Sequence, residues 1–455
     1  MSTPAITRRE ALRRLALGAA GVWAFPHLVR AREGGRAANE RLNLAFIGVG
    51  GKGEEPALGL SADNYVAFCD VDPDRAAKAY GQFPTVPQFR DFRVMFDQLG
   101  AKIDAVVISA PDHVHYTAGM TAMQLGKHVY IEKPLAPTIW ETRQLHAMAK
   151  KSGVVTQMGI QGHSFAGLRV LKEWIDAGAV GDVTEVFLWT DRLNLQRWSG
   201  LQVDAPAERK PDGFPFDLWL SGRRPRAYSS RYVPQAWRSW WDFGSGAIGD
   251  IAVHMMDVVE FCLGVGFPTR VTDNSPHRGG PTVPRWSETT FEYPARGARP
   301  AITLHWCNGY KGDVLNKPAG VPHVPAELIA RETNVIAFTG TRGTILVPDM
   351  RASSRPQIFP LEREREFTAH LPPATLPRPK GGHFADWLQA IREGGKAGAD
   401  FDYSAPLTEA VLLGTLAQRT GRPIVWDRAR MSALDVPEAD ALLKPELSPE
   451  WLVTV

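Results

Sequence analysis

The chain has few cysteines, almost no net charge and no long apolar run. Its three cysteines, Cys69, Cys262 and Cys307, are too few and too scattered for a disulfide framework or a cysteine metal cage. The 52 basic residues nearly balance the 49 acidic ones, giving a formal charge of +3, so the electrostatic footprint of a nucleic-acid-binding protein is missing. No stretch reaches the roughly 20 residues without charges or proline that a membrane-spanning helix needs. We therefore expect no nucleic-acid partner and no stable membrane span.

The first 38 residues are typical of a targeting segment with a short linker. Arg8 and Arg9 precede a weakly apolar run at 15–25, and small residues near Ala31 suit cleavage. This pattern resembles a twin-arginine export signal, so we predict export by the twin-arginine machinery and a periplasmic location. The alternative is a basic amphipathic helix of the mature protein, although the apolar run lacks a polar face.

Apolar runs alternate with helical patterns from residue 39 to residue 160. The length of 455 residues predicts roughly two or three domains, and the hydrophobic fraction of 44% supports globular folding. Such alternation predicts an α/β domain with a doubly wound parallel sheet. Strands are expected at 42–47, 65–69, 105–109, 128–131 and 154–158, and helices at 73–80, 115–124 and 138–150.

The pattern changes in the second expected domain, at 161–455. A helix, a strand and then a long irregular stretch at 192–240 come first, and the high Trp content of this stretch argues against disorder. Later strands are expected to form an antiparallel sheet, and two late helices could return to brace the first domain. The expected helices are 168–177, 247–263, 383–392 and 407–419, and the expected strands are 183–190, 287–293, 301–306, 334–338 and 344–347.

A glycine turn with the spacing G-x-G-x-x-G follows the first expected strand. Glycine permits a tight turn there and lets the backbone approach a pyrophosphate, which predicts dinucleotide binding. Asp70 ends the second strand, where its carboxylate can accept hydrogen bonds from ribose hydroxyls and repel a 2′-phosphate. We therefore predict NAD as the cofactor, and the nearby Arg75 leaves NADP possible. The glycines expected to bind it are Gly48, Gly50, Gly51 and Gly53.

Polar residues also follow the third expected strand. Ser109, Pro111, His113 and His115 lie where ligands bind in such a sheet, and we predict that they contact the cofactor. Capping of the following helix is the other interpretation of this stretch. A His-x-His pair beside Asp112 superficially suggests a metal, but no further ligand accompanies it at helical or hairpin spacing, so we predict no metal.

Two further motifs supply candidate chemistry. Glu132 and Lys133 lie in a Glu-Lys-Pro tripeptide at the end of the fourth strand, where both are expected to meet the cofactor. Asp250 and His254 are four residues apart on a predicted helix and therefore share a face. Oxidation of an alcohol needs a base for the hydroxyl proton, and a histidine pKa near 6.5 suits that task, while Lys133 could hold the hydroxyl oxygen. The alternative is that Asp250 caps the helix and His254 packs in the core.

Together these motifs resemble the Gfo/Idh/MocA family, which is named for glucose-fructose oxidoreductase, inositol dehydrogenase and a rhizopine catabolism protein. The resemblance spans nearly the whole chain after residue 38. It implies an N-terminal Rossmann domain at 39–160 and a C-terminal α/β domain at 161–455, built on a large open, mostly antiparallel sheet. That second domain would bind the substrate and join subunits into a dimer or tetramer.

The resemblance also implies roles for single residues. Lys133 would be the catalytic lysine, Asp250 a carboxylate that positions the substrate and His254 the acid/base. The implied substrate is a sugar, cyclitol or glycoside. Two departures from the family pattern, Ser245 within the usual glycine triplet and Ala252 between the acid and the histidine, leave this chemistry intact. Further expected substrate contacts are Gln157, Trp237, Arg238 and Trp241. Structural packing is the alternative for most of the tryptophans.

The predicted activity is hydride transfer between a nicotinamide and a hydroxyl of a sugar, cyclitol or glycoside. Because twin-arginine export normally moves folded proteins, a cofactor bound before export could travel with the enzyme, so we expect tight binding. Recycling of the cofactor in place would favour a two-substrate redox cycle, or an NAD-dependent glycosidase acting by transient oxidation, elimination and re-reduction. A non-catalytic nicotinamide-binding protein is the third interpretation.

Overall fold

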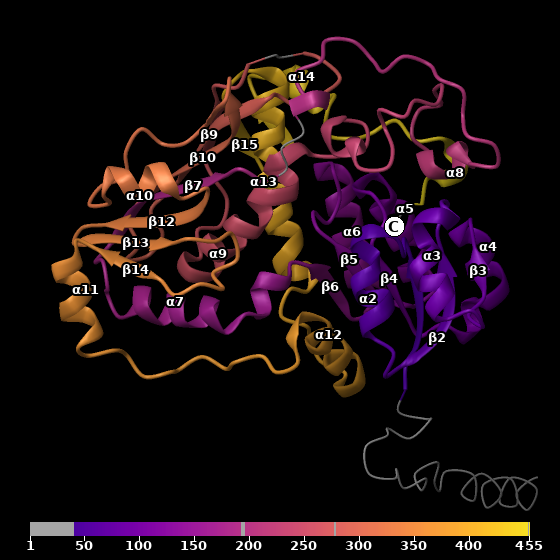
Figure 1. The fold of residues 1–455 in the computed structure, drawn as a ribbon, viewed down its shortest axis with the longest axis horizontal. Coiled ribbons are helices and arrows are strands. Elements are labelled where there is room, and N and C mark those ends of the chain that lie inside the picture. Colours follow the sequence, from indigo (N-terminus) through magenta and orange to yellow (C-terminus); the bar gives the residue numbers. More distant parts are fainter. Residues whose placement is uncertain (1–40, 193–195, 277–278, 454) are drawn as a thin grey trace, which may run out of the picture.

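The computed structural model describes residues 41–192, 196–276, 279–453 and 455. The predicted twin-arginine signal and linker at 1–38 lie outside these residues. Figure 1 shows a parallel sheet with its helices, in indigo, beside a larger sheet drawn mainly in orange, with helix α13 between the two. Within the described part of the chain, no helix combines the length and the apolar character that a bilayer crossing demands.

The first sheet, here called the Rossmann sheet, has six parallel strands in the order β3-β2-β1-β4-β5-β6. Its central strands β1 and β4 are apolar runs buried on both faces, as parallel strands covered by helices should be. The strand order reverses between β1 and β4, which opens a crevice at the carboxyl ends of these strands. The predicted doubly wound α/β fold is therefore confirmed. The strands are β1 (Asn43–Ile47), β2 (Asn64–Cys69), β3 (Gln88–Phe89), β4 (Ala105–Ile108), β5 (His128–Glu132) and β6 (Thr156–Gly159).

Local capping defines the helices of this first half. Helix α6 begins with Thr138, whose hydroxyl oxygen accepts the backbone N–H of Glu141 at 3.3 Å, and ends with Gly153 in the left-handed conformation. The Asp72 and Asp91 side chains cap α3 and α4 in the same way. The helices are α2 (Glu54–Gly59), α3 (Pro73–Gln82), α4 (Phe92–Leu99), α5 (Asp112–Gln124) and α6 (Ile139–Ser152).

The second sheet, here called the C-terminal sheet, is ten-stranded and mostly antiparallel. Among the described strands of this sheet only β7 and β10 pair in parallel, so the predicted large antiparallel sheet is confirmed with one parallel pair at its centre. One face packs on α7 (Ala166–Asp176), α9 (Val253–Leu263) and α13 in the largest hydrophobic core. The strands in spatial order are β14 (Gln357–Phe359), β13 (Gly343–Val347), β12 (Asn334–Gly340), β7 (Val183–Thr190), β10 (Ile302–Lys311), β9 (Trp286–Tyr293), β8 (Arg270–Asp273), β15 (Ile424–Asp427) and β16 (Ser432–Leu434), with β11 (Val314–Leu315) beside β10.

Small helices complete this half of the molecule. They follow strands or connect loops at the edge of the C-terminal sheet (Figure 1). They are α10 (Ala326–Arg331), α11 (Leu361–Thr368) and α14 (Pro437–Asp440).

Two late helices return to the first half, as the sequence suggested. Helix α12 (Gly382–Glu393) covers one face of the Rossmann sheet, where Trp387 is fully buried in a core that also contains Phe46 and Tyr130. Helix α13 (Phe401–Thr420) contacts α6 and β6 on one side and strands of the C-terminal sheet on the other. The helix layer on this face of the Rossmann sheet, which also contains α2 and α3, is therefore completed by residues far along the chain.

Residues 196–243, here called the insert, lie over the carboxyl edge of the Rossmann sheet (Figure 1). Around the short helix α8 (Phe216–Leu220), buried aromatic side chains form a separate cluster that includes Trp219, Trp237 and Trp240. Packing therefore accounts for most tryptophans of this stretch. Trp451 anchors the insert to the first half of the molecule, because its ring packs on Phe92 and its side chain lies against Gly222.

The packing of α12 yields a stability prediction. Trp387→Ala should lower the free energy of unfolding by about 3–5 kcal/mol, because a fully buried indole under the Rossmann sheet would leave a cavity. Urea unfolding followed by circular dichroism measures the change. Leu371→Ala, at a leucine that is 53% exposed, is the matched control and should change stability by less than about 0.5 kcal/mol. Equal stability of the two variants would contradict the role of α12 in the helix layer on the Rossmann sheet.

Candidate active site

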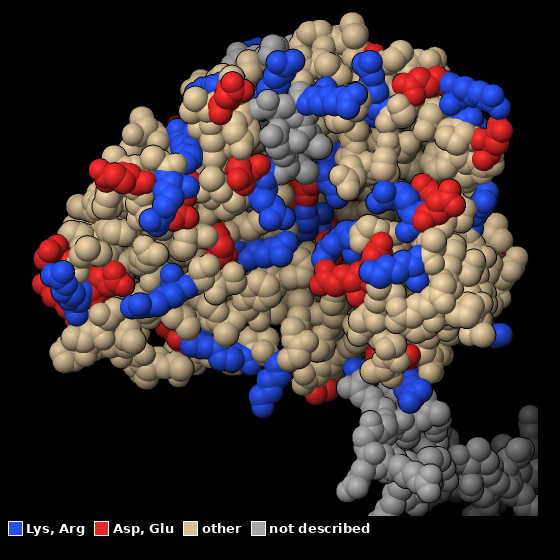
Figure 2. Space-filling model, viewed as in Figure 1, with Lys and Arg blue, Asp and Glu red and all other residues tan. Residues whose placement is uncertain are grey.

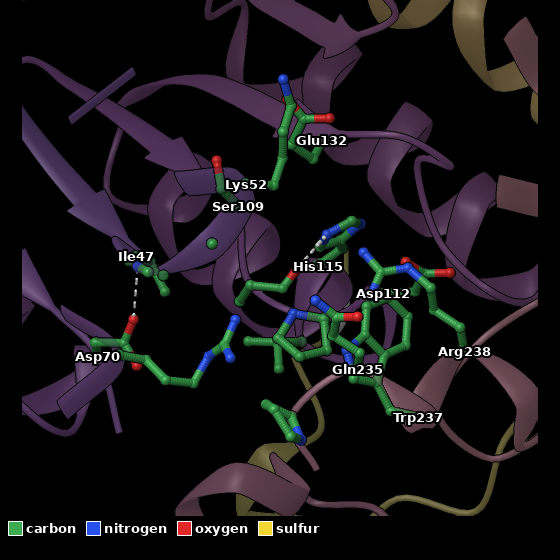
Figure 3. A pocket seen from close by; sticks show the side chains of 18 of the residues that line it. Ile47, Lys52, Asp70, Ser109, Asp112, His115, Glu132, Gln235, Trp237 and Arg238 are labelled. Atoms are coloured by element: carbon green, nitrogen blue, oxygen red, sulfur yellow. Dashed lines mark hydrogen bonds and ion pairs between the residues drawn. The ribbon is translucent and has the colours of Figure 1, made fainter. Parts of the chain in front are cut away.

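A cavity of about 460 Å³ lies at the carboxyl ends of the Rossmann strands. Its walls come from the loops after β1, β2, β4 and β5, from the insert and from the segment after β13. Figure 3 shows Asp70 at one end of the cavity and Trp237 and Arg238 at the other, with Asp112 and His115 between them. Residues from the whole length of the chain therefore meet in one space.

The glycine turn after β1 requires glycine for steric reasons. Gly48 has a φ of +79°, and a β-carbon there would lie 2.6 Å from the backbone nitrogen of Ala110. A β-carbon at Gly53 would lie 1.9 Å from the carbonyl oxygen of Gly48. Gly48, Gly50 and Gly51 line the cavity, whereas Gly53 supports the turn from behind. The turn thus presents bare backbone to the cavity, as close approach of a pyrophosphate requires.

Asp70 lines the cavity at the end of β2 and also holds the glycine turn. Its Oδ2 accepts the backbone N–H groups of Val49 at 2.9 Å and Gly50 at 3.2 Å, and its Oδ1 accepts that of Asp72 at 3.0 Å. Burial raises the pKa of Asp70, and these backbone hydrogen bonds oppose the rise. One carboxylate therefore fixes the turn and leaves about one lone pair, on Oδ1, at the position predicted for ribose recognition.

The strand end after β4 supplies six residues to the cavity wall, four of them predicted or polar. Ser109, Pro111, Asp112 and His115 all line it, and the Ser109 hydroxyl is buried without a hydrogen-bond partner among the described residues. The ring nitrogens of His115 face the carbonyl oxygens of Pro134 at 3.0 Å and Ala110 at 2.9 Å. Burial lowers the pKa of His115 to about 4. His115 therefore ties the strand end of β4 to the turn that follows Lys133.

Asp112 is a buried carboxyl group that the sequence placed only as a helix cap or cofactor contact. Its side chain is 3% exposed, and Ser245 Oγ donates a hydrogen bond to its Oδ2 at 3.2 Å. Burial, together with the charge of Asp250, raises the pKa of Asp112 to about 8. At neutral pH this group therefore carries a proton within the cavity wall.

Lys133, Arg238 and Asp250 meet as a buried ionic triad. Lys133 Nζ donates to the Asp250 backbone carbonyl at 2.8 Å and also to its Oδ1, and Arg238 Nε donates to Oδ2 at 2.9 Å. Burial alone would raise the pKa of Asp250, but the two cations hold it below its ordinary value. The carboxylate is therefore charged, and it joins Lys133 to Arg238.

Asp250 and His254 lie on a helix with an irregular first turn. Residues Ile248–Ala252 form a π-helical turn, η7, that continues into α9. Such turns are rare and frequently occur at functional sites. The sequence predicted one regular helix at 247–263 and missed this turn, because hydrophobic spacing does not encode it. Both side chains nevertheless line the cavity.

His254 is a buried neutral imidazole. It is 2% exposed, and its Nδ1 has no hydrogen-bond partner among the described residues. Burial, with the cations Lys133, Arg351 and Lys52, lowers the pKa of His254 well below its ordinary value. The unpartnered Nδ1 argues against a satisfied core histidine, and a neutral imidazole in the cavity wall fits the acid/base interpretation.

Glu132 lies behind Lys133 as a second buried acid. Its Oε1 accepts a hydrogen bond from Gln161 Nε2 at 2.9 Å and lies 3.9 Å from Lys52 Nζ, while its Oε2 is buried without a partner among the described residues. Burial raises the pKa of Glu132, and Lys52 and Lys133 oppose the rise. Glu132 therefore sits in the cavity wall, as predicted for a residue beside the cofactor.

Besides Gly53, three predicted site residues are not brought to the cavity lining. His113 is buried under the insert, where its Nε2 lies 2.7 Å from the Trp219 carbonyl oxygen, and burial lowers its pKa to about 3. Gln157 instead joins β6 to the returning chain through Ala399 N–H, at 2.9 Å, and Asp386. Trp241 packs under Arg419. Their positions correct the predicted cofactor contact of His113 and the predicted substrate contacts of Gln157 and Trp241.

Sequence reasoning also missed residues that the cavity includes. Gln161 follows β6, Arg192 follows β7, Gln235 lies in the insert and Arg351 follows β13. The positions of Gln161 and Arg192 just after strands are a weak signal. Arg351 had none, because no motif links the end of β13 to the Rossmann sheet. Within the described ranges, no group of three His, Cys, Asp or Glu side chains is placed to hold a metal ion.

Two family models match the chain. The first, an oxidoreductase family with an NAD-binding Rossmann fold, matches residues 42–160. The second, the C-terminal alpha/beta domain of the oxidoreductase family, matches residues 169–305. Together they cover more than half of the 455 residues.

Similar proteins include sugar and cyclitol dehydrogenases. Levoglucosan dehydrogenase of Pseudarthrobacter phenanthrenivorans is 26% identical over 236 residues, which are 50% of this chain and 52% of that protein. Inositol 2-dehydrogenase 3 of Saccharopolyspora erythraea is 30% identical over 148 residues, 31% of this chain and 42% of that protein. The chain thus matches about half, or less, of the length of these curated relatives.

A solved structure shares the fold over most of the chain. Levoglucosan dehydrogenase in complex with NADH and levoglucosan matches with a TM-score of 0.54 at 19% identity, covering 87% of this chain and 100% of that one. At this identity the likeness shows the common architecture of the two sheets.

The environment of His254 predicts an unusual titration. Because its folded pKa lies well below 6.5, the ring should stay neutral as the pH falls from about 8 to about 5.5. NMR of the ¹⁵N-histidine-labelled protein measures this, and the His254→Asn spectrum identifies the His254 signals. A His254 midpoint near 6.5 would contradict the buried neutral state.

Proposed function

The chain belongs to the Gfo/Idh/MocA oxidoreductase family, and from that premise we propose that it is an NAD(P)-dependent oxidoreductase acting on a CH–OH group. It would transfer hydride between a nicotinamide cofactor and a hydroxyl of a sugar, cyclitol or glycoside. The supporting observation is that Lys133, Asp250 and His254 converge on one cavity with the glycine turn. Nothing in the described site favours the glycosidase or the non-catalytic alternative.

The residues present fit a dinucleotide. The bare backbone at Gly48 and Gly50, the carboxylate of Asp70 and the unpartnered hydroxyl of Ser109 are the groups that would hold it. Asp70 is the basis for our preference for NAD over NADP. When bound, the nicotinamide supplies the hydride acceptor or donor, and the protein supplies orientation and proton transfer.

The side chains divide the remaining chemistry between them. Lys133 has three N–H donors, of which two are used on Asp250, so one remains for the oxygen of a substrate hydroxyl. Asp250 holds the lysine in place in the cavity wall. His254, a neutral imidazole that lines the cavity, accepts the proton that the hydroxyl loses as hydride departs.

The substrate class follows from the relatives and from the cavity wall. The named relatives act on levoglucosan and inositol, which are rings bearing several hydroxyls. Trp237 and Arg238 line the end of the cavity away from Asp70, where an aromatic face can cover the apolar C–H patch of such a ring. The homo-oligomer implied by the family resemblance stays a proposal, which light scattering of the purified protein tests.

Two substitutions test the proposed chemistry. Lys133→Met and His254→Asn should each lower kcat by about 10²–10⁴, because each removes a group that handles the hydroxyl or its proton. Reduction of NAD at 340 nm with a panel of sugars and cyclitols measures the rate, and NADH fluorescence checks that the cofactor still binds.

The matched control is Lys151→Met, at an exposed lysine near the end of α6. It should leave kcat within about twofold of the parent protein, as surface substitutions usually do. Full turnover by both Lys133→Met and His254→Asn would remove the roles proposed for these side chains.

We also infer that the protein is exported with its cofactor. The sequence basis is Arg8-Arg9 before an apolar run, and the insert and Trp451 cover the cavity in a way that suits retention of a bound nucleotide.

Cell fractionation and mass spectrometry test this inference. The parent chain should be recovered from the periplasm with NAD released on denaturation, and Arg8→Lys with Arg9→Lys should keep it in the cytoplasm. Arg41→Lys with Arg422→Lys is the control for a change of two arginines and should be exported normally. Export unaffected by Arg8→Lys with Arg9→Lys, or a periplasmic protein free of NAD, would contradict it.

A further inference from the structure

Cationic side chains are concentrated around the substrate end of the cavity. Five of them line it on this side: Lys52, Lys133, Arg192, Arg238 and Arg351. Figure 2 shows Lys and Arg side chains, with a few acidic ones, around the recess in the middle of the face shown. Three of the five have acidic partners. Lys133 and Arg238 pair with Asp250, and Lys52 pairs with Glu55 and lies 3.9 Å from Glu132.

The other two cations have no acidic partner. Among the described residues, neither Arg192 nor Arg351 forms an ion pair. The Nε atom of Arg351 is buried and donates to no acceptor in the described chain. Arg192 is exposed at the rim of the cavity, whereas Arg351 is half-buried, and holding a half-buried guanidinium without an acidic partner is costly, so an anionic ligand would stabilise Arg351.

The C-terminal sheet explains why these arginines meet. Thr190, at the end of β7, pairs with Asn334 at the start of β12, and Val347, at the end of β13, pairs with Ile336. The ends of β7 and β13 therefore lie at the same edge of the sheet, separated only by β12. Arg192 lies two residues after β7 and Arg351 four residues after β13, so the two arginines enter the cavity from neighbouring places.

Their position separates them from the cofactor phosphates. The charge of Arg351 acts on His254 and on Tyr130, which lie on the Glu132 side of the cavity. The arginine near Asp70 is instead Arg75, whose guanidinium lies beside Gly51. Arg351 therefore faces the side of the cavity where a substrate hydroxyl would meet His254.

We propose that Arg351 and Arg192 form a binding subsite for an anionic group on the substrate, so that the enzyme acts on an acidic sugar rather than a neutral one. This proposal rests on the proposed function, because the same site must place a ring hydroxyl at Lys133 and His254. Planar guanidinium groups match a carboxylate or a phosphate with paired hydrogen bonds, and either group on a sugar ring satisfies this chemistry. The anion would also offset the cations that surround His254.

Binding and turnover measured on the same probes test the subsite. The probes are glucose, glucuronate, which carries a carboxylate, and glucose 6-phosphate, titrated into the NADH-loaded protein by calorimetry and then assayed with NAD. At least one acidic probe should bind about tenfold or more tightly than glucose, as hydrogen bonds to charged groups allow. The acidic probe that binds more tightly shows whether the subsite prefers a carboxylate or a phosphate.

Substitutions of the two arginines test whether they cause the preference for acidic probes. Arg351→Gln, and to a lesser degree Arg192→Gln, should reduce the ratio of acidic-probe affinity to glucose affinity about tenfold or more, while NADH affinity stays at the parent level. Arg365→Gln, at an exposed arginine of α11, is the control and should leave the ratio unchanged.

The outcomes separate this proposal from the proposed function. Glucose binding as tightly as both acidic probes, or an equal loss for all probes in Arg351→Gln, overturns the anionic subsite even if sugars are oxidised. Preferential binding of an acidic probe that is lost in Arg351→Gln supports the subsite. If no probe or other sugar is then oxidised, the oxidoreductase function fails while the subsite stands.

Discussion

The ion pairs of Asp250 are the interaction on which the site depends. Asp250 belongs to the second half of the chain, Lys133 to the end of β5 in the Rossmann sheet and Arg238 to the insert, so one carboxylate joins three parts of the molecule. A buried carboxylate is stable in its charged form only when partners replace its lost hydration. The two cations supply that replacement, and in return Asp250 fixes the direction of Lys133. The ion pairs of Asp250 therefore both position Lys133 and hold the walls of the cavity together.

The rest of the chain keeps these three parts together. Helix α12 completes the layer that α2 and α3 form on one face of the Rossmann sheet, and Arg392 on it donates to Asp63 at 2.6 and 2.7 Å. The insert is anchored by buried Arg223, which pairs with Glu141 of α6 at 2.7 Å. Because these contacts join residues far apart in sequence, removal of the residues from α12 onward would loosen the cavity as well as the helix layer on the Rossmann sheet.

Burial sets the protonation of the site more than any single neighbour does. At neutral pH Asp112 holds a proton, which is the reverse of its state in water, and His254 stays neutral at pH values where a free imidazole would take up a proton. Both pKa shifts have burial as the largest cause; Asp250 adds to the shift of Asp112 while Arg238 and Lys133 oppose it, and nearby cations add to the shift of His254. A hydroxyl in this cavity would meet the lysine N–H donors and a neutral imidazole, a combination suited to polarising the oxygen and removing its proton.

The sequence alone determined the architecture of the strands and the identity of the main chemical groups. Apolar runs, the glycine spacing and the Glu-Lys-Pro and Asp-x-x-x-His motifs are local patterns, and they predicted both sheets together with Lys133, Asp250 and His254. Short edge strands such as β3, β14 and β16 were missed because two or three residues have no periodicity to detect. Only the tertiary structure decided that His113 and Gln157 are structural and that Arg192 and Arg351 enter the cavity. Those outcomes depend on which strand ends share an edge, and that is settled by long-range pairing and burial rather than by neighbours in sequence.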